Sequence, residues 1–262
     1  KKQLVDCNYN WNQVFFQQLA KSMGLKVNAI GMEEMAKNTS VLLFDKLGNN
    51  KLATESILFG QAGFLEENRE GEEYYNSLKR EYEFHQVKNN LIPIKKQSWK
   101  FSKMRPSNFP TLRLAQLAQL ITAKSSLFDV FINKEVSIEE IRNNLKCSIV
   151  DGFWHTHYTF ETESKPKNKS IGKTLIDSII INTVSPFLYI YGIYKDELVF
   201  LEKAIELLEE LPPEDNKITR LFDQKIAMDN AANSQGLIHC YKELCVAKKC
   251  LDCSIGIHLL KK

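Results

Sequence analysis

The chain has 262 residues, of which 44% are hydrophobic, 10% aromatic and 26% charged, and its formal net charge is +3. These proportions exclude an intrinsically disordered chain, and the 11 glycines and 7 prolines exclude a collagen-like one. The net charge is too small to name a binding partner. Asp177, Asn182 and Pro186 interrupt the longest apolar run, so we expect no membrane-spanning helix. Because no secretory signal opens the chain, we expect a cytoplasmic location.

Helical spacing dominates the first ninety residues. Apolar residues recur three and four apart over 11–23, and Gly24 follows as a stop signal. Asn28 is expected to cap a second helix. Further amphipathic helices are predicted near 52–65 and around 74–85.

A proline-rich segment, 92–110, interrupts this pattern, because three prolines each bias the preceding residue away from helix. Pro110 then opens a strongly apolar helix that runs to Leu120. Short helices are predicted from Leu127 and from Ser137, where Ser-Ile-Glu-Glu has the pattern of a capping box.

The next part of the chain is less regular. Aromatic residues over 153–160 favour an extended stretch, and a polar loop, 161–170, follows. Helix resumes at Thr174, with Pro186 predicted as a kink or break. An acidic amphipathic helix over 198–211 ends at two prolines.

These patterns, with two or three more helices over 217–260, predict an all-α protein. We expect an irregular multi-helix array of about ten helices with a proline-rich connecting loop. The β-branched and aromatic residues of 179–191 leave a buried strand open as an alternative there. The length fits a single helical domain, 1–262, or two lobes, 1–92 and 93–262.

Motifs for nucleotide binding and catalysis fail on inspection. Gly172-Lys173-Thr174 resembles the end of a P-loop, but the first glycine of that motif is replaced by Lys167 and no apolar strand precedes it. Neither a GxSxG nor an HExxH pattern occurs. The sequence therefore favours a non-catalytic role for this chain.

Two basic segments are candidates for binding nucleic acid through its phosphates. The first contains no acidic residue and interleaves cations with aromatic rings that can stack on bases: Lys95, Lys96, Trp99, Lys100, Lys103, Arg105 and Arg113. The second lies on the polar loop before a helix start, which also favours anions: Lys165, Lys167, Lys169 and Lys173. The alternative is structural, with the aromatic residues anchoring a loop to the core and the cations solvated or paired.

Four of the six cysteines lie in the last 23 residues, as Cys240-x4-Cys245-x4-Cys250-x2-Cys253. One continuous helix would scatter these thiols around its circumference, whereas a turn near Lys248-Lys249 would gather them. The set then suits tetrahedral zinc, with an iron–sulfur cluster a weaker match to the spacing. Inert buried thiols are the other interpretation.

Several short strings together resemble one known family. They are Trp99-Lys-Phe101, Arg105-Pro-Ser-Asn-Phe-Pro110-Thr-Leu-Arg113-Leu-Ala-Gln116, Gly60-Gln-Ala-Gly-Phe-Leu65, Tyr82-Glu-Phe84, Ile181-Asn-Thr-Val184 and Lys249-Cys-Leu-Asp-Cys-Ser-Ile-Gly256. From about Trp11 to its end, the chain is similar to the bacterial family catalogued as domain of unknown function 2851.

This resemblance implies no activity, because the family has none assigned. It implies that the chain is the C-terminal, helical portion of a longer bacterial protein. The N-terminal region of such proteins is β-rich and restriction-endonuclease-like, and it is expected to be absent here. The cysteine pattern of the family maps onto Cys245, Cys250 and Cys253, which leaves the fourth ligand of any metal site open between Cys240 and His258.

Two functional hypotheses follow. The first is a non-catalytic module that positions the N-terminal domain of its parent protein on nucleic acid. The second is a structural or protein-interaction domain whose C-terminal cysteines form a zinc or iron–sulfur staple.

Overall fold

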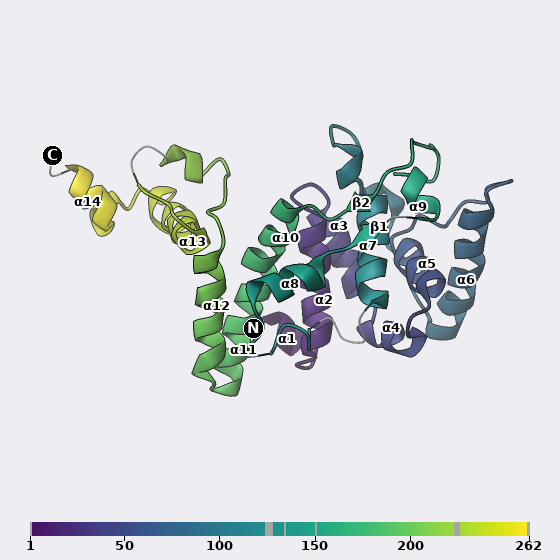
Figure 1. The fold of residues 1–262 in the computed structure, drawn as a ribbon, viewed down its shortest axis with the longest axis horizontal. Coiled ribbons are helices and arrows are strands. Elements are labelled where there is room, and N and C mark those ends of the chain that lie inside the picture. Colours follow the sequence, from purple (N-terminus) through teal and green to yellow (C-terminus); the bar gives the residue numbers. More distant parts are fainter. Residues whose placement is uncertain (1, 124–127, 134, 150, 223–225, 261–262) are drawn as a thin grey trace. The chain divides into compact units, whose positions relative to one another are not determined.

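Two compact units, Lys1–Thr183 and Val184–Lys262, make up the chain in the computed structural model, and each is described by itself (Figure 1). The structure describes residues 2–123, 128–133, 135–149, 151–222 and 226–260. The lobe boundary considered at 92/93 falls inside the first unit.

The first unit consists of α-helices with one short two-stranded sheet. Its α-helices are α1 (Lys2–Asp6), α2 (Trp11–Met23), α3 (Ala29–Lys37), α4 (Val41–Leu47), α5 (Lys51–Gln61), α6 (Glu73–Asn89), α7 (Pro110–Thr122), α8 (Ile138–Leu145), α9 (Phe153–Thr156) and α10 (Lys173–Ile179). The 3-10 turns η1 (Lys96–Ser98) and η2 (Pro106–Asn108) lie in the proline-rich segment. Strand β1 (Ser148–Ile149) pairs antiparallel with β2 (Lys169–Ser170). The predicted all-α class is confirmed.

Helices α5 and α7 form the centre of this unit. Every residue of α5 from Ala53 to Gln61 is buried, and so is every residue of α7 from Pro110 to Ala118. A helix that is buried all round must be packed on several sides, here by α6 and α7 against α5. The two central helices therefore position the segments at their ends, including the proline-rich one.

Helix ends follow the local signals closely, with one exception. The capping box at Ser137 is present, because its hydroxyl accepts from the Glu140 N–H while the Glu140 carboxylate accepts from the Ser137 N–H. Asn28 precedes α3 but its side chain does not cap that helix. It instead brackets the backbone of Lys100, donating to the carbonyl at 2.9 Å and accepting from the N–H at 2.9 Å.

The irregular middle of the chain is more helical than its residue types predict. The extended stretch predicted over 153–160 is wrong at its start, where α9 forms a helical turn that directs Trp154 into the core. The predicted helix start at Leu127 lies outside the described residues, and 128–131 forms turns. The strand alternative over 179–191 is excluded, since α10 continues into the π-helical turn η3 (Ile180–Val184) and then into helix.

The second unit is also helical. Its elements are α11 (Ser185–Lys195), α12 (Leu198–Glu210), η4 (Thr219–Leu221), α13 (Ala231–Cys240), the π-helical turn η5 (Tyr241–Cys245), η6 (Cys250–Asp252) and α14 (Ser254–Leu260). Helices α11 and α12 form a close hairpin at Gly192, where an added Cβ would lie 2.3 Å from Leu201 Cδ1. Pro186 lies in the first turn of α11, directly after the π-helical turn η3, so the helical run changes its hydrogen-bond pattern where a kink or break is predicted.

One helical run, Lys173–Lys195, is long and apolar enough to cross a membrane by length and composition. However, 61% of its most apolar window is buried in the structure, as in the core helix of a folded domain. This run is therefore weak evidence for a membrane segment.

Candidate functional site

The proline-rich segment and the loop after α9 together enclose a cleft of about 330 Å³ in the first unit. Four phenylalanines form its walls: Phe64, Phe101, Phe109 and Phe160. Because of these rings we call it the aromatic cleft. Arg69, Lys96 and Glu161 supply its charged groups. It brings together three parts of the chain, within 64–69, 96–111 and 159–161.

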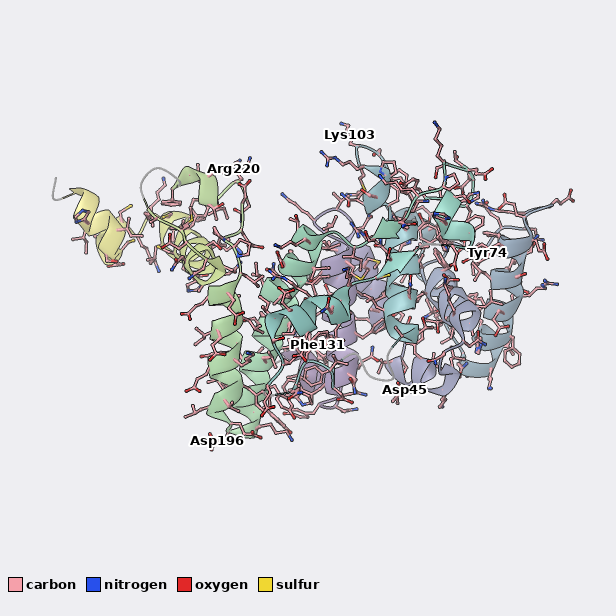
Figure 2. All side chains as sticks on the ribbon, viewed as in Figure 1. Asp45, Tyr74, Lys103, Phe131, Asp196 and Arg220 are labelled. Carbon is pink, nitrogen blue, oxygen red and sulfur yellow. The ribbon has the colours of Figure 1, made fainter. Side chains whose placement is uncertain are left out.

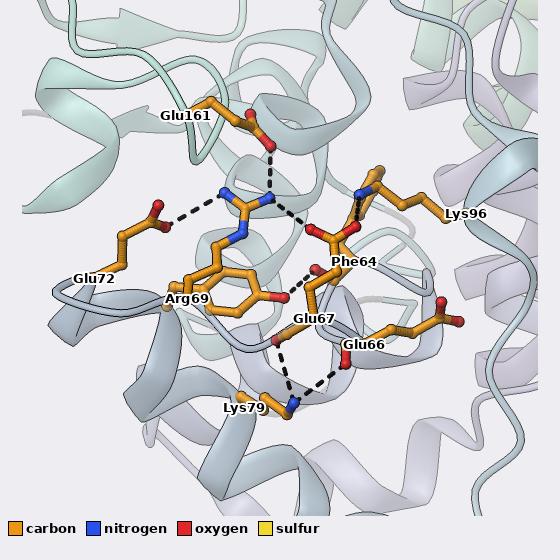
Figure 3. Close-up of polar contacts among 9 residues, drawn as sticks. Phe64, Glu66, Glu67, Arg69, Glu72, Lys79, Lys96 and Glu161 are labelled. Atoms are coloured by element: carbon orange, nitrogen blue, oxygen red, sulfur yellow. Dashed lines mark hydrogen bonds and ion pairs between the residues drawn. The ribbon is translucent and has the colours of Figure 1, made fainter.

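Arg69 is the centre of a charged network at this cleft (Figure 3). Its guanidinium lies 2.7 Å from Glu161 and 3.4 Å from Glu72, and it stacks over the ring of Tyr75 at 4.6 Å. Burial is the largest single effect and acts to raise the pKa of Glu161, but the hydrogen bond and charge of Arg69, together with hydrogen bonds from the Glu161 backbone and Thr159, lower it overall. Arg69 therefore clamps the loop after α9 to the start of α6.

Lys96 forms an ion pair in the same network. Its Nζ lies 2.9 Å from a carboxylate oxygen of Glu67, and this ion pair is the main cause of the lowered pKa of Glu67. Lys96 is 40% exposed, so it remains at the rim of the cleft. A phosphate would have to compete with Glu67 for this lysine.

Trp99 does not offer its ring to solvent, which corrects the expectation that it stacks on bases. It is 7% exposed, packs against Phe64 with centroids 5.5 Å apart, and donates from Nε1 to the carbonyl of Ala62 at 2.7 Å. An amphipathic aromatic residue is most stable when its apolar ring is buried and its N–H is satisfied. Trp99 thus anchors the proline-rich segment, as the structural alternative expects.

Arg113 is also buried, which corrects the expectation that it contacts nucleic acid. It is 6% exposed, and its two terminal nitrogens donate to Gln116 and Asn108, both at 2.8 Å. Burial lowers the pKa of Arg113 to about 10. The side chain joins the last residue of η2 to the helix that follows, so it orders the segment from within.

Lys169 is the third predicted contact that the fold buries. It is 4% exposed, and its Nζ donates to the carbonyls of Trp154 at 2.8 Å and His157 at 2.7 Å. The ammonium also lies 3.9 Å from the ring centroid of Tyr158. Burial lowers the pKa of Lys169 to about 8. This lysine holds α9 and its following turn against β2.

Replacing Lys169 with methionine should change how stability depends on pH. The folded chain releases this proton near pH 8 and the unfolded chain near 10.5, so the unfolded state binds more protons between these values. Stability of the wild type therefore rises through that window, by up to about 3 kcal/mol. Urea unfolding at pH 7.5 and pH 10 should show that the free energy of unfolding of the wild type rises relative to that of Lys169→Met. Parallel pH curves for the two proteins would contradict the assignment.

The remaining predicted cations lie at the surface. Seven are exposed and take part in none of the ion pairs of the described residues: Lys95, Lys100, Lys103, Arg105, Lys165, Lys167 and Lys173. Figure 2 shows Lys103 pointing away from the unit. Thr111, within the first basic segment, donates to the carbonyl of Tyr158, a few residues before the second, so a hydrogen bond joins the parts of the chain that carry the two segments.

A buried hydrogen-bonded chain behind the cleft was not expected from the sequence. Tyr74 donates to Glu55 at 2.8 Å and accepts from Trp154 Nε1 at 2.8 Å. Burial raises the pKa of Glu55 and is also the main reason that the pKa of Tyr74 is raised. Glu55 is the one carboxylate of α5, and this is the only local signal for the chain of hydrogen bonds.

The four C-terminal cysteines line a single cavity of about 140 Å³ in the second unit. Cys240 Sγ and Cys253 Sγ are 3.8 Å apart. Hydrogen bonds from the backbone N–H groups of Gly256 and Ile255 lower the pKa of Cys253, whereas burial and Cys253 raise that of Cys240. Within the described residues, no three Cys, His, Asp or Glu side chains are already arranged around a metal.

Residues 1–217 match the family model described as Protein of unknown function (DUF2851). The chain belongs to the DUF2851 family. The resemblance expected from Trp11 to the end is corrected at both limits, since the DUF2851 match begins at residue 1 and stops before the four C-terminal cysteines. Comparisons with curated proteins and with solved structures gave no significant match. The DUF2851 match covers the aromatic cleft and both basic segments, but it assigns them no activity.

Proposed function

We propose that the first unit is a non-catalytic module that binds nucleic acid through its phosphates. In this proposal it positions another domain of the same bacterial, cytoplasmic protein. One observation carries the proposal: two basic segments, separated in the sequence, keep seven exposed cations outside the ion pairs of the described residues, and the hydrogen bond from Thr111 to Tyr158 joins the parts of the chain that carry them. Cations without carboxylate partners are free to replace the counterions of a phosphate backbone.

The buried members of the basic segments support this role indirectly. Arg113 and Lys169 hold the two segments from inside, through side-chain and backbone acceptors rather than through carboxylates. A contact surface whose loops are already ordered loses less conformational entropy on binding. Rigid loops with solvated cations fit a preformed backbone-binding surface.

The expected binding mode is independent of base sequence. Trp99 is unavailable for stacking, and the cleft phenylalanines Phe101 and Phe109 are half-buried. Contacts to phosphates fix position but carry no direct sequence information. We therefore expect similar affinity for duplexes of different sequence.

Two pairs of substitutions test this proposal. Lys103→Gln with Arg105→Gln, and Lys165→Gln with Lys167→Gln, each remove two exposed cations from one basic segment. Each pair should make the plot of log K against log salt shallower by about 1.5 to 2 for duplex DNA, because each lost phosphate contact contributes about 0.9. Fluorescence anisotropy with a labelled 20-base-pair duplex and single strand, over a salt series, measures the slopes.

The matched control is Lys46→Gln with Lys51→Gln, which removes the same charge. Both lysines are exposed, and Lys51 begins α5, whereas Gln61 at its other end accepts from the Ile94 N–H of the proline-rich segment. Ten residues of helix separate these ends by about 15 Å. The control should keep the wild-type slope. Equal loss in all three pairs, or no binding by the wild type at low salt, would reject the proposal.

A second candidate function is protein interaction, and exposed apolar residues favour it. Phe84 and Val87 on α6 are 59% and 81% exposed, and Ile92 just beyond it is 75% exposed. Exposed apolar groups that lie close together often mark contact surfaces. Absence of nucleic-acid binding, with a mass above that of a monomer in light scattering, would favour this second function.

A further inference from the structure

The C-terminal cysteines are brought together by a change of helix type. Helix α13 ends at Cys240 and continues as the π-helical turn η5, which ends at Cys245. The Val246 N–H donates to the Tyr241 carbonyl, five residues earlier, at 3.0 Å. In such a turn residues five apart lie nearer to the same side than in a regular α-helix, which rotates them about 140° apart. The π-turn therefore places Cys240 and Cys245 on the same side.

A reversal of the chain then returns the other two thiols to the same place. Lys248 adopts a left-handed conformation with φ of 55°, at the position where a turn is predicted. Its neighbour Lys249 donates to the Leu244 carbonyl at 2.8 Å, which closes this helix end. Cys250 and Cys253 follow on η6 and at the start of α14, and all four cysteines line one cavity.

The thiol spacing matches one edge of a zinc tetrahedron. With Zn–S bonds of about 2.3 Å, two thiolates of a tetrahedral site lie about 3.8 Å apart. Cys240 Sγ and Cys253 Sγ are 3.8 Å apart, and Cys245 is close enough to interact with Cys240. Backbone N–H groups of Ile255 and Gly256 donate to Cys253, a type of outer contact that orients metal-bound thiolates.

Inert packing does not explain the whole cluster. Cys253 is buried, but Cys245 and Cys250 are exposed, which is unusual for thiols that serve as small core hydrophobes. Cys147 in the first unit is such a core thiol, since it is buried and desolvation raises its pKa to about 12. Exposed side chains at the cavity edge can rotate inward without unpacking a core.

A glycine allows the close approach of α14 to η6. At Gly256, an added Cβ would lie 2.3 Å from the carbonyl oxygen of Cys250, so α14 can pack on η6 only through a glycine. Lys248 and Lys249 are exposed beside the cavity and would offset the negative charge of four thiolates.

We propose that Cys240, Cys245, Cys250 and Cys253 bind one zinc ion tetrahedrally and that this ion closes the C-terminal end of the second unit. Metal binding at such a site contributes directly to folding, because the ligands are far apart in the unfolded chain. The proposal stands apart from nucleic-acid binding, which concerns the first unit.

The test is a cobalt titration of the full, reduced, metal-free chain. Thiolate ligation should produce charge-transfer and tetrahedral d–d absorption that saturates at one cobalt per chain and disappears when zinc displaces it. This measurement uses the wild type, so it does not depend on how any variant folds. Absence of these bands would overturn the proposal, and so would a Cys240–Cys253 disulfide that persists in reductant or an iron–sulfur chromophore in protein purified without air.

Single substitutions identify the ligands. Cys240→Ala and Cys253→Ala should each weaken zinc binding on the order of 100-fold, about a quarter of the binding free energy typical of such a site. Cys7→Ala removes a thiol of the first unit and should leave binding unchanged. Unaltered zinc affinity in Cys253→Ala would reject this ligand set.

Discussion

Replacing Trp154 with alanine is expected to lower the free energy of unfolding by about 3–5 kcal/mol, the range for removing a buried aromatic side chain. The ring is 2% exposed, stacks on Phe59 at 5.1 Å and meets Phe160 edge-on at 5.1 Å. Its removal opens a cavity at the back of the aromatic cleft and leaves the Tyr74 hydroxyl without its donor. Urea unfolding followed by far-ultraviolet circular dichroism measures the change.

Trp154→Phe separates packing from hydrogen bonding at the same position. A phenyl ring retains most of the stacking on Phe59 but cannot donate to Tyr74, so the loss should fall to about 1–3 kcal/mol. The proposed packing of this core is wrong if the alanine variant is as stable as the wild type. Equal losses in both would instead assign the whole effect to the hydrogen bond.

Gly63→Ala should be the most disruptive small substitution, with a loss of about 2–4 kcal/mol. Gly63 has φ of 74°, and an added Cβ would lie 2.3 Å from the carbonyl oxygen of Ile94. The left-handed conformation costs alanine about 1–2 kcal/mol, and the clash with backbone adds the range typical of overpacking. Since Ile94 lies in the proline-rich segment, the variant should also weaken binding of duplex DNA.

Gly71→Ala is the matched control for backbone conformation. Gly71 has φ of 77°, but nothing lies within 4 Å of an added Cβ. Its loss should therefore be limited to about 1–2 kcal/mol, and DNA binding should be unchanged. Equal stability losses at the two glycines would show that the contact with Ile94 does not constrain the segment. Urea unfolding and the anisotropy assay measure both effects.

Local rules in the sequence account for most helices and several of their ends. Helix α2 covers the predicted 11–23, and Pro110 opens α7 as expected, because helical spacing and end signals act over three or four residues. The capping box at Ser137 is a contact of the same short range. The helical turn at Phe153–Thr156 escaped prediction because aromatic residues fit a strand locally, while packing of Trp154 favours the turn.

The fate of the cations was decided only by tertiary structure. Lys167 and Lys169 lie two residues apart in one polar loop, yet the first is exposed and the second is buried. Lys169 is held by carbonyls of Trp154 and His157, fifteen and twelve residues away, and no local pattern in the sequence reveals that these groups converge on it. Likewise, Arg69 meets Glu161 across 92 residues to shape the aromatic cleft.

By itself, then, the sequence determined the helical class, the position of the basic segments and the clustering of cysteines, because these depend on residue type and short spacing. Only the fold decided which cations face solvent and that a hydrogen bond joins the parts of the chain that carry the two basic segments. It also decided that a π-turn aligns Cys240 with Cys245. These features depend on contacts between residues distant in the chain, whose free energy is determined by packing rather than by local pattern.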